Sequence, residues 1–129
     1  MSVIFQSIAP VLLVKDVAGS AEYWATKVGF EFSLYNEPPT FAILWKDDIK
    51  IMLAQVGQDV KILPNWRVVN CTNDVYIWID DVKSLYEKLT QNGTNIDYTL
   101  YDTPWGTREF GIQDLDDHDI TFGQVLEAK

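Results

Sequence analysis

The chain has 129 residues, 47% of them hydrophobic, and this size and composition predict one globular domain over residues 1–129. Its formal charge of −9 would repel a phosphate backbone, so we do not expect nucleic acid as a partner. No apolar run approaches the roughly 20 residues that cross a membrane, and no signal-peptide pattern is present, so no membrane association and a cytoplasmic location are predicted.

The first part of the chain predicts the element order strand, helix, strand, strand, strand. Apolar residues at helical spacing (Ala21, Trp24, Ala25 and Val28) predict the helix, and Gly29 is typical of a helix end. Short apolar runs separated by turn residues predict the strands. The helix is expected over residues 21–28 and the strands over 11–14, 30–35, 41–45 and 49–54.

The second part of the chain repeats this order after a stretch that shows no periodicity. Gly57 and Pro64 interrupt that stretch, which predicts an irregular connector. A helix then opens at residues 80–81 and closes at 92–93. The four strands are expected over residues 74–79, 96–101, 107–113 and 118–125.

The two parts also match each other residue by residue, as an internal repeat requires. A shift of 69 positions places Phe41 on Phe110, and a shift of 65 places Val14 on Ile79. We therefore expect one module over about residues 6–55, a connector over 56–72 and a second module over 73–126.

Four segments resemble one known protein family. They are the run from Pro10 to Asp16, the pairs Tyr23-Trp24 and Gly29-Phe30, the run Pro104-Trp-Gly-Thr-Arg-Glu-Phe110, and the run Asp114-Leu-Asp-Asp-His118. Together with the paired βαβββ order, they resemble the glyoxalase/bleomycin-resistance superfamily, also called vicinal oxygen chelate proteins, and its bleomycin-resistance branch most of all. The resemblance implies an α+β fold, in which two βαβββ modules form a curved mixed sheet around a concave cavity, with helices on the outer face.

The same resemblance implies where a metal ion would lie, because the family's enzymes hold a divalent ion with four side chains. Carried over by position, those ligands fall on Ala9, Met52, Asp74 and Thr121. Alanine has no donor atom and a thioether is a poor ligand for hard or borderline ions, whereas a protein metal site needs at least three good ligands. We therefore predict that the family's metal site is lost, and we expect no cofactor.

Strand alternation predicts which side chains face the cavity. If Asp74 points inward, so do Tyr76 and Trp78, and a hairpin that pairs Thr121 with Gly111 adds Glu109, Gln113 and Gly123. The repeat adds Thr40, Ala42 and Leu44. Small residues on such a face would leave volume for a small molecule, although a partner subunit or large side chains from the other module would fill the same space. The predicted ligand-binding residues are Asp74, Tyr76, Trp78, Met52, Trp105, Glu109, Gln113 and Thr121.

Three residues invite other roles. Trp105 suits a groove wall, a dimer contact or core packing. His118, the single histidine, lies in an Asp-rich turn and is expected to be solvated there rather than to act as a base. Cys71, the single cysteine, excludes an internal disulfide and is expected to be a buried small hydrophobic residue.

Three functions remain open at this point. The resemblance favours binding over catalysis: a homodimer that sequesters a planar or cationic small molecule. The first alternative is a metal-dependent lyase, isomerase or dioxygenase that uses another ligand set, for which Asp74, Glu109 and Gln113 are the candidates. The second is an interaction module without a small ligand.

Overall fold

The computed structural model describes residues 2–127, and it confirms the α+β class and the two βαβββ modules. The first module contains β1 (Val11–Val14), α1 (Val17–Tyr23), η1 (Trp24–Val28), β2 (Glu31–Tyr35), β3 (Phe41–Lys46) and β4 (Ile49–Gln55). The connector contains the short helix α2 (Asn65–Val68). The second module contains β5 (Val75–Trp78), α3 (Val82–Gln91), β6 (Ile96–Asp102), β7 (Thr107–Gln113) and β8 (Asp119–Val125).

Both main helices begin at an aspartate cap. The Asp16 carboxylate accepts a hydrogen bond from the Gly19 amide at 3.1 Å, so α1 starts at Val17, four residues earlier than the apolar spacing predicted. The helix continues into the single π-turn η1 and ends where Gly29 adopts a φ of 93°. Asp81 caps α3 in the same way, through the Ser84 amide at 3.2 Å.

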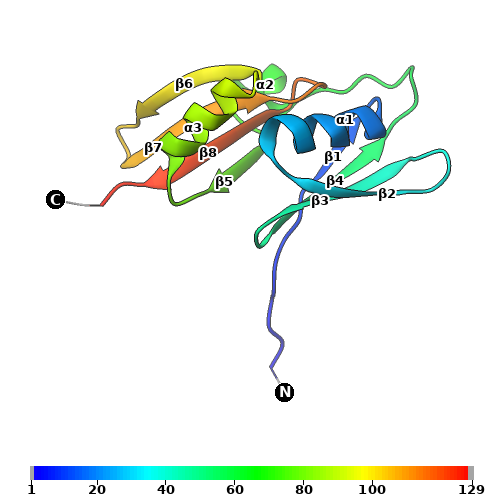
Figure 1. Ribbon diagram of the computed structural model, residues 1–129, viewed down its shortest axis with the longest axis horizontal. Helices are drawn as coiled ribbons and strands as arrows, with labels where there is room; N and C mark the ends of the chain where they lie inside the picture. Colours follow the sequence, from blue (N-terminus) through cyan, green and yellow to red (C-terminus); the bar gives the residue numbers. More distant parts are fainter. Residues whose placement is uncertain (1, 128–129) are drawn as a thin grey trace.

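The strands form two separate four-stranded sheets rather than one continuous sheet, in the orders β1-β4-β3-β2 and β5-β8-β7-β6. The parallel pairs are β1 with β4 and β5 with β8, and all other neighbouring strands are antiparallel. Each module packs its helix on one face of its own sheet, and the two modules lie side by side (Figure 1). Fully buried side chains such as Trp24 of η1, Leu89 of α3 and Phe110 of β7 form the core.

The register of β3 corrects one sequence prediction. Ile43, not Ala42, pairs with Met52, and Ala42 and Leu44 are fully buried against α1 instead of facing the open side of the sheet. Because Gly111 pairs with Thr121 in the second module, the correct shift is 68 positions for β3 and 69 for β4. The one-residue difference in the hairpin sends every β3 side chain to the opposite face.

The N-terminal segment extends away from the rest of the molecule without regular secondary structure (Figure 1). Four of its hydrophobic side chains are 79–97% exposed: Val3, Ile4, Phe5 and Ile8. The open face of the first sheet adds Val11 and Leu13, which are about half exposed. This part of the protein therefore presents an apolar surface that nothing within the described chain covers.

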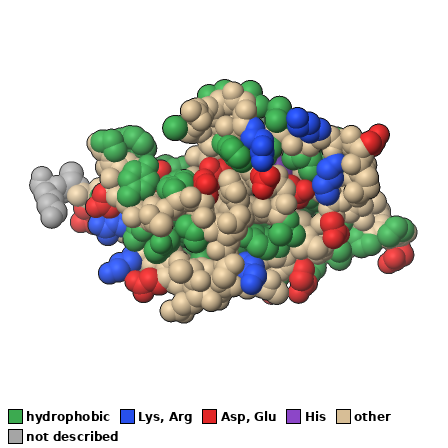
Figure 2. All heavy atoms as spheres, turned by 90° about the horizontal axis from the view of Figure 1, so that it is seen from above, with side chains coloured by type: hydrophobic (Ala, Val, Ile, Leu, Met, Phe, Trp, Pro, Cys, Tyr) green, Lys and Arg blue, Asp and Glu red, His purple; other side chains and the backbone are tan. Residues whose placement is uncertain are grey.

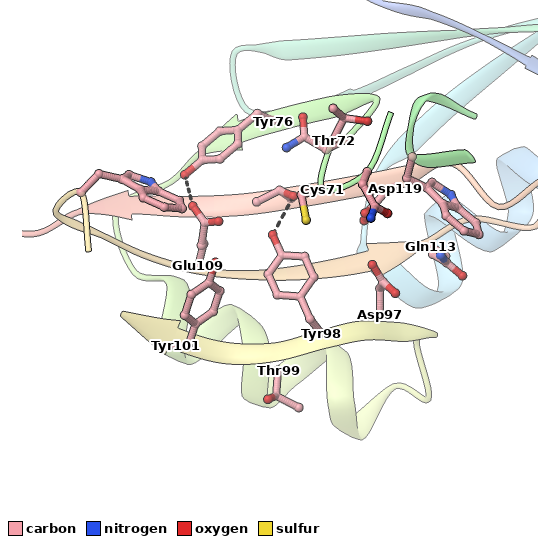
Figure 3. A pocket seen from close by; sticks show the side chains of 15 residues that line it. Cys71, Thr72, Tyr76, Asp97, Tyr98, Thr99, Tyr101, Glu109, Gln113 and Asp119 are labelled. Atoms are coloured by element: carbon pink, nitrogen blue, oxygen red, sulfur yellow. Dashed lines mark hydrogen bonds between the residues drawn. The ribbon is translucent and has the colours of Figure 1, made fainter. Parts of the chain in front are cut away.

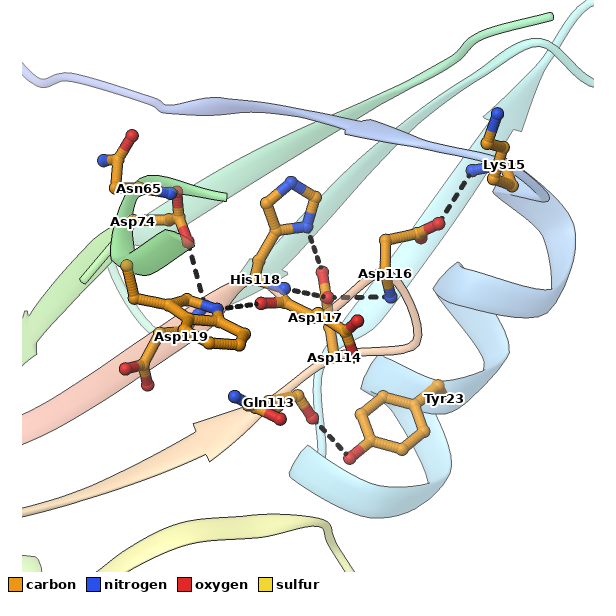
Figure 4. Close-up of polar contacts among 11 residues, drawn as sticks. Lys15, Tyr23, Asn65, Asp74, Gln113, Asp114, Asp116, Asp117, His118 and Asp119 are labelled. Carbon is orange, nitrogen blue, oxygen red and sulfur yellow. Dashed lines mark hydrogen bonds and ion pairs between the residues drawn. The ribbon is translucent and has the colours of Figure 1, made fainter. Parts of the chain in front are cut away.

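Polar contacts connect the two modules near the loop between β7 and β8 (Figure 4). The Lys15 amide donates to the Asp116 carboxylate at 3.1 Å, and the Tyr23 hydroxyl donates to the Gln113 carbonyl at 2.9 Å. On the helix side, the Thr94 hydroxyl donates to the Lys27 carbonyl at 3.0 Å. These bonds fix the second module's hairpin against α1.

No helix within residues 2–127 is long and apolar enough to cross a membrane. On the face shown in Figure 2, acidic side chains lie scattered among hydrophobic and basic ones rather than in one patch.

Candidate functional site

A cavity of about 800 Å³ lies between the inner face of the second sheet and the connector (Figure 3). Its volume is in the range of small-molecule sites in proteins. The first module contributes no lining residue. The lining consists of Trp66, Asn70, Cys71, Thr72, Asn73, Tyr76, Asp97, Tyr98, Thr99, Tyr101, Trp105, Glu109, Gln113, Asp119 and Thr121.

Two glycines set the floor of this cavity. A Cβ atom at Gly111 would overlap the ring of Tyr98, and one at Gly123 would overlap the hydroxyl of Tyr76. The volume that these small residues leave is therefore filled by two tyrosine rings lying against the sheet. The ligand space predicted on this face exists, but it lies above aromatic rings rather than above bare backbone.

Irregular pairing in β6 supplies residues that strand alternation missed. The register shifts between Ile96 and Tyr98 and again between Tyr98 and Tyr101. As a result Asp97 and Tyr98, adjacent in sequence, both line the cavity, which a regular strand does not allow. A β-bulge of this kind has no simple sequence signal, so the alternation pattern could not reveal these residues.

Glu109 forms a hydrogen-bonded group at the end of the cavity near Trp105. Its carboxylate, 6% exposed, accepts from the Tyr76 hydroxyl at 2.7 Å and from the Thr107 hydroxyl at 3.2 Å. Burial, together with the bond to Glu109, raises the pKa of Tyr76 to about 12. Tyr76 therefore remains a neutral donor at physiological pH, and both hydrogen bonds reach the Oε2 atom of Glu109.

Asp97 and Asp119 point toward each other at the opposite end of the cavity (Figure 3). Asp119 is 6% exposed, and its Oδ1 atom has no hydrogen-bond partner among the described residues. Burial first, and then the charge of the nearby Asp97 carboxylate, raise the pKa of Asp119 to about 7. The Asp119 carboxyl group is therefore largely protonated below about neutral pH.

The predicted binding residues divide into two groups. Tyr76, Trp105, Glu109, Gln113 and Thr121 line the cavity, and ligand binding by them stays a prediction. The other three lie elsewhere. Trp78, 60% exposed, borders a separate shallow pocket, and Met52 belongs to the first sheet. Asp74 anchors the connector, because its carboxylate accepts from the Asn65 amide at 3.0 Å and from the Asp119 amide at 2.9 Å.

The four family metal positions do not fit a metal ion. Ala9 and Met52 offer no oxygen or nitrogen side-chain donor, and both oxygens of Asp74 are engaged by backbone N–H groups. The Thr121 hydroxyl is hydrogen-bonded to the Tyr98 hydroxyl at 2.8 Å. Within residues 2–127 no three or more His, Cys, Asp or Glu side chains are grouped so as to hold a metal ion. The alternative ligand set is also divided, because Asp74 lies outside the cavity that Glu109 and Gln113 line.

Two single residues differ from their predictions. His118 is buried, 5% exposed, and its Nδ1 atom lies 2.8 Å from the Asp114 carboxylate, so it is not a solvated turn residue (Figure 4). Asp114 also accepts from the His118 amide at 2.8 Å, which closes the turn around the ring. Cys71 is exposed on the connector rather than buried. Burial alone would lower the pKa of His118, but its hydrogen bond to Asp114 and the charge of that carboxylate raise it overall.

The sequence model of the Glyoxalase/Bleomycin resistance protein/Dioxygenase superfamily matches residues 5–122. A search of curated proteins found no match. Several solved structures share the fold at low sequence identity. TioX from Micromonospora sp. ML1 is 22% identical, with a TM-score of 0.69 over 96% of this chain and 99% of that one.

Two further structures give the same result. A glyoxalase-related enzyme from Clostridium phytofermentans is 14% identical, with a TM-score of 0.77 over 96% of this chain and 98% of that one. The bleomycin-binding protein from bleomycin-producing Streptomyces verticillus, solved with copper(II)-bleomycin, is 22% identical, with a TM-score of 0.68 over 98% of this chain and 100% of that one. Identities this low show a common fold and nothing finer.

Proposed function

Since the chain belongs to the Glyoxalase/Bleomycin resistance protein/Dioxygenase superfamily, we propose that it acts as a metal-independent binding protein that sequesters a small aromatic molecule. We favour an aromatic ligand that also carries a positive charge. The observation that carries the proposal is the cavity of the second module. Its walls include Tyr76, Tyr98, Tyr101 and Trp105, and an aromatic ligand can stack on such side chains.

The chemistry of the site favours binding over the family's metal-dependent reactions. The four family positions do not provide a metal ligand set. The neutral Tyr76 hydroxyl donates to Glu109, and the Tyr98 hydroxyl is hydrogen-bonded to that of Thr121. The nearest analogy among the structural relatives is the Streptomyces verticillus protein with copper(II)-bleomycin. A glycopeptide antibiotic of that kind is therefore the first ligand to test.

A titration followed by tryptophan fluorescence tests the proposal. Trp105 lines the cavity and is 68% exposed, so bleomycin binding there is expected to change its emission. The change should become smaller in Trp105→Phe, which leaves only Trp66 in the cavity lining, and it should be kept in full in Trp78→Phe, the matched control for an exposed tryptophan outside the cavity. No change at high micromolar ligand in the wild type would exclude this ligand class.

We also propose that the protein is a homodimer in which a second copy covers the first module. Support comes from the extended N-terminal segment with its exposed Val3, Ile4, Phe5 and Ile8, and from the open face of the first sheet beside it. Apolar surface of this extent on a monomer usually marks an interaction site.

A further inference from the structure

The cavity contains three carboxyl groups, and they are not equivalent. Asp97, Glu109 and Asp119 line it, while no Lys, Arg or His belongs to the lining among the described residues. The Oε2 atom of Glu109 accepts hydrogen bonds from the hydroxyls of Tyr76 and Thr107. Glu109 therefore already has donors within the protein, and it holds Tyr76 in place.

Asp119 is in the opposite situation. It is 6% exposed, and its Oδ1 atom has no hydrogen-bond donor within the described part of the chain. Its nearest charged neighbour in the cavity is another carboxyl group, that of Asp97 (Figure 3). A buried acceptor without a donor is costly, and the charge of Asp97 disfavours ionisation of Asp119, so the pair favours a positively charged donor.

We propose that Asp97 and Asp119 form a subsite for a positively charged nitrogen group, an ammonium or amidinium, of a ligand whose aromatic part lies against Tyr98. The inference rests on the proposed function, since it names the chemical class that the same cavity selects. An N–H donor supplies the hydrogen bond that Asp119 lacks, and its charge replaces the repulsion between the carboxyl groups with attraction to both.

An organic cation suits this pair better than a metal ion. A divalent ion needs three or more strong ligands, and no such group of His, Cys, Asp or Glu exists within residues 2–127. An ammonium or amidinium needs only acceptors for its N–H groups and an apolar surface for the rest of the molecule. Tyr98, next to Asp97 on β6, provides that surface within the same cavity.

Two matched probes test the inference on the full chain: naphthylmethylammonium and its neutral analogue naphthylmethanol. Calorimetry and chemical-shift perturbation should show the cation binding in the cavity at least about tenfold more tightly than the alcohol. Asp97→Asn and Asp119→Asn should each reduce the affinity for the cation about tenfold and leave that for the alcohol unchanged. Asp97 is exposed, so its variant is expected to fold even if the buried substitution at 119 does not.

Two controls separate this subsite from general attraction to a chain of charge −9. Asp48→Asn removes one charge from an exposed turn of the first module, and Glu87→Gln removes one from the exposed side of α3, outside the cavity; both should keep the preference for the cation. Equal binding of the two probes, or an unchanged preference in Asp97→Asn, would overturn the subsite while leaving the binding function intact. No binding of either probe at millimolar concentration would overturn both.

Discussion

Gly111 and Gly123 determine how the cavity's tyrosines lie, because each tyrosine ring occupies the place of an absent Cβ atom. Gly111→Ala should therefore push Tyr98 off the sheet and lower the free energy of unfolding by about 1–3 kcal/mol, as overpacking does. In a Tyr98→Ala background, Gly111→Ala should cost much less free energy of unfolding than in the wild type, since the ring that clashes is absent. Chemical denaturation of the four proteins measures the coupling, and additive effects would contradict the stacking account.

The raised pKa of Asp119 predicts how the stability of the fold depends on pH. The pKa of Asp119 rises to about 7 on folding, so the folded protein binds more protons than the unfolded chain between about pH 4 and 7, and stability falls as pH rises through that window. His118 changes stability in the same direction. Its raised pKa gives stability that is present below about pH 6.5 and is lost as the pH rises through the pKa of His118 in the folded protein.

Calorimetry at constant ionic strength should thus give a Tm several degrees lower at pH 8 than at pH 5.5. Asp119→Asn should flatten this slope, because it removes one of the two titrating groups, while Asp48→Asn should leave it unchanged. A Tm that rises with pH in the wild type, or a slope unaffected by Asp119→Asn, would show that Asp119 does not titrate as described.

At the scale of elements, the position of the connector depends on the hydrogen bonds of the Asp74 carboxylate. Its carboxylate accepts two backbone N–H groups, one where α2 begins and one where β8 begins, and Trp66 adds a bond from its indole to the Asp117 carbonyl at 2.6 Å. The position that would hold a metal ion in the family's enzymes therefore serves here to hold the connector over the cavity.

Asp74→Asn tests that role, because an amide can accept only one of the two bonds and presents its NH₂ group to the other donor. We expect a loss of roughly 1–3 kcal/mol in unfolding free energy. Hydrogen exchange should become faster across Asn65–Val68, with little change in α3. If exchange accelerated equally in both modules, the carboxylate would be acting on the whole fold rather than on the connector.

The order of helices and strands was predictable from the sequence, whereas some strand faces were not. Helical spacing and the repeat predicted the order of strands and helices, and the shift of 65 positions correctly related β1 to β5, since Val11 and Tyr76 pair with the equivalent residues Met52 and Thr121. The face of β3 was wrong because one hairpin is a residue shorter than the repeat implied. Asp97, Tyr98 and Tyr101 were missed because bulges interrupt β6.

Asp119 is a different case, since strand alternation could have revealed it. It lies two residues before Thr121 on the same face of β8, so the pattern that located Thr121 extends to it. The burial of His118 could not have been foreseen in this way. It follows from the hydrogen bonds to Asp114 within the turn, which become visible only when the turn's backbone is known.

For the molecule as a whole, the exposed N-terminal segment predicts self-association. Light scattering after gel filtration should give twice the 14.8 kDa mass of one chain at micromolar concentration. Replacing Val3, Ile4, Phe5 and Ile8 with serine should convert the protein to a monomer, because it removes the apolar side chains that a second copy would cover.

Val68→Ser/Val69→Ser is the matched control for that experiment, since these exposed valines lie in and just after α2 and should not affect assembly. A monomeric wild type, or a dimer that persists after the four serine substitutions, would show that this segment does not mediate association.

The central claim is that the cavity of the second module binds an aromatic small molecule without a metal ion. The most direct measurement is a nitrogen-15 NMR titration of metal-free, chelator-treated protein with bleomycin. We predict saturable shifts in the amides of Tyr76, Tyr98, Trp105 and Asp119, with no change in affinity when zinc or manganese is added. Shifts confined to the first module, or binding that appears only after a metal ion is supplied, would contradict the account.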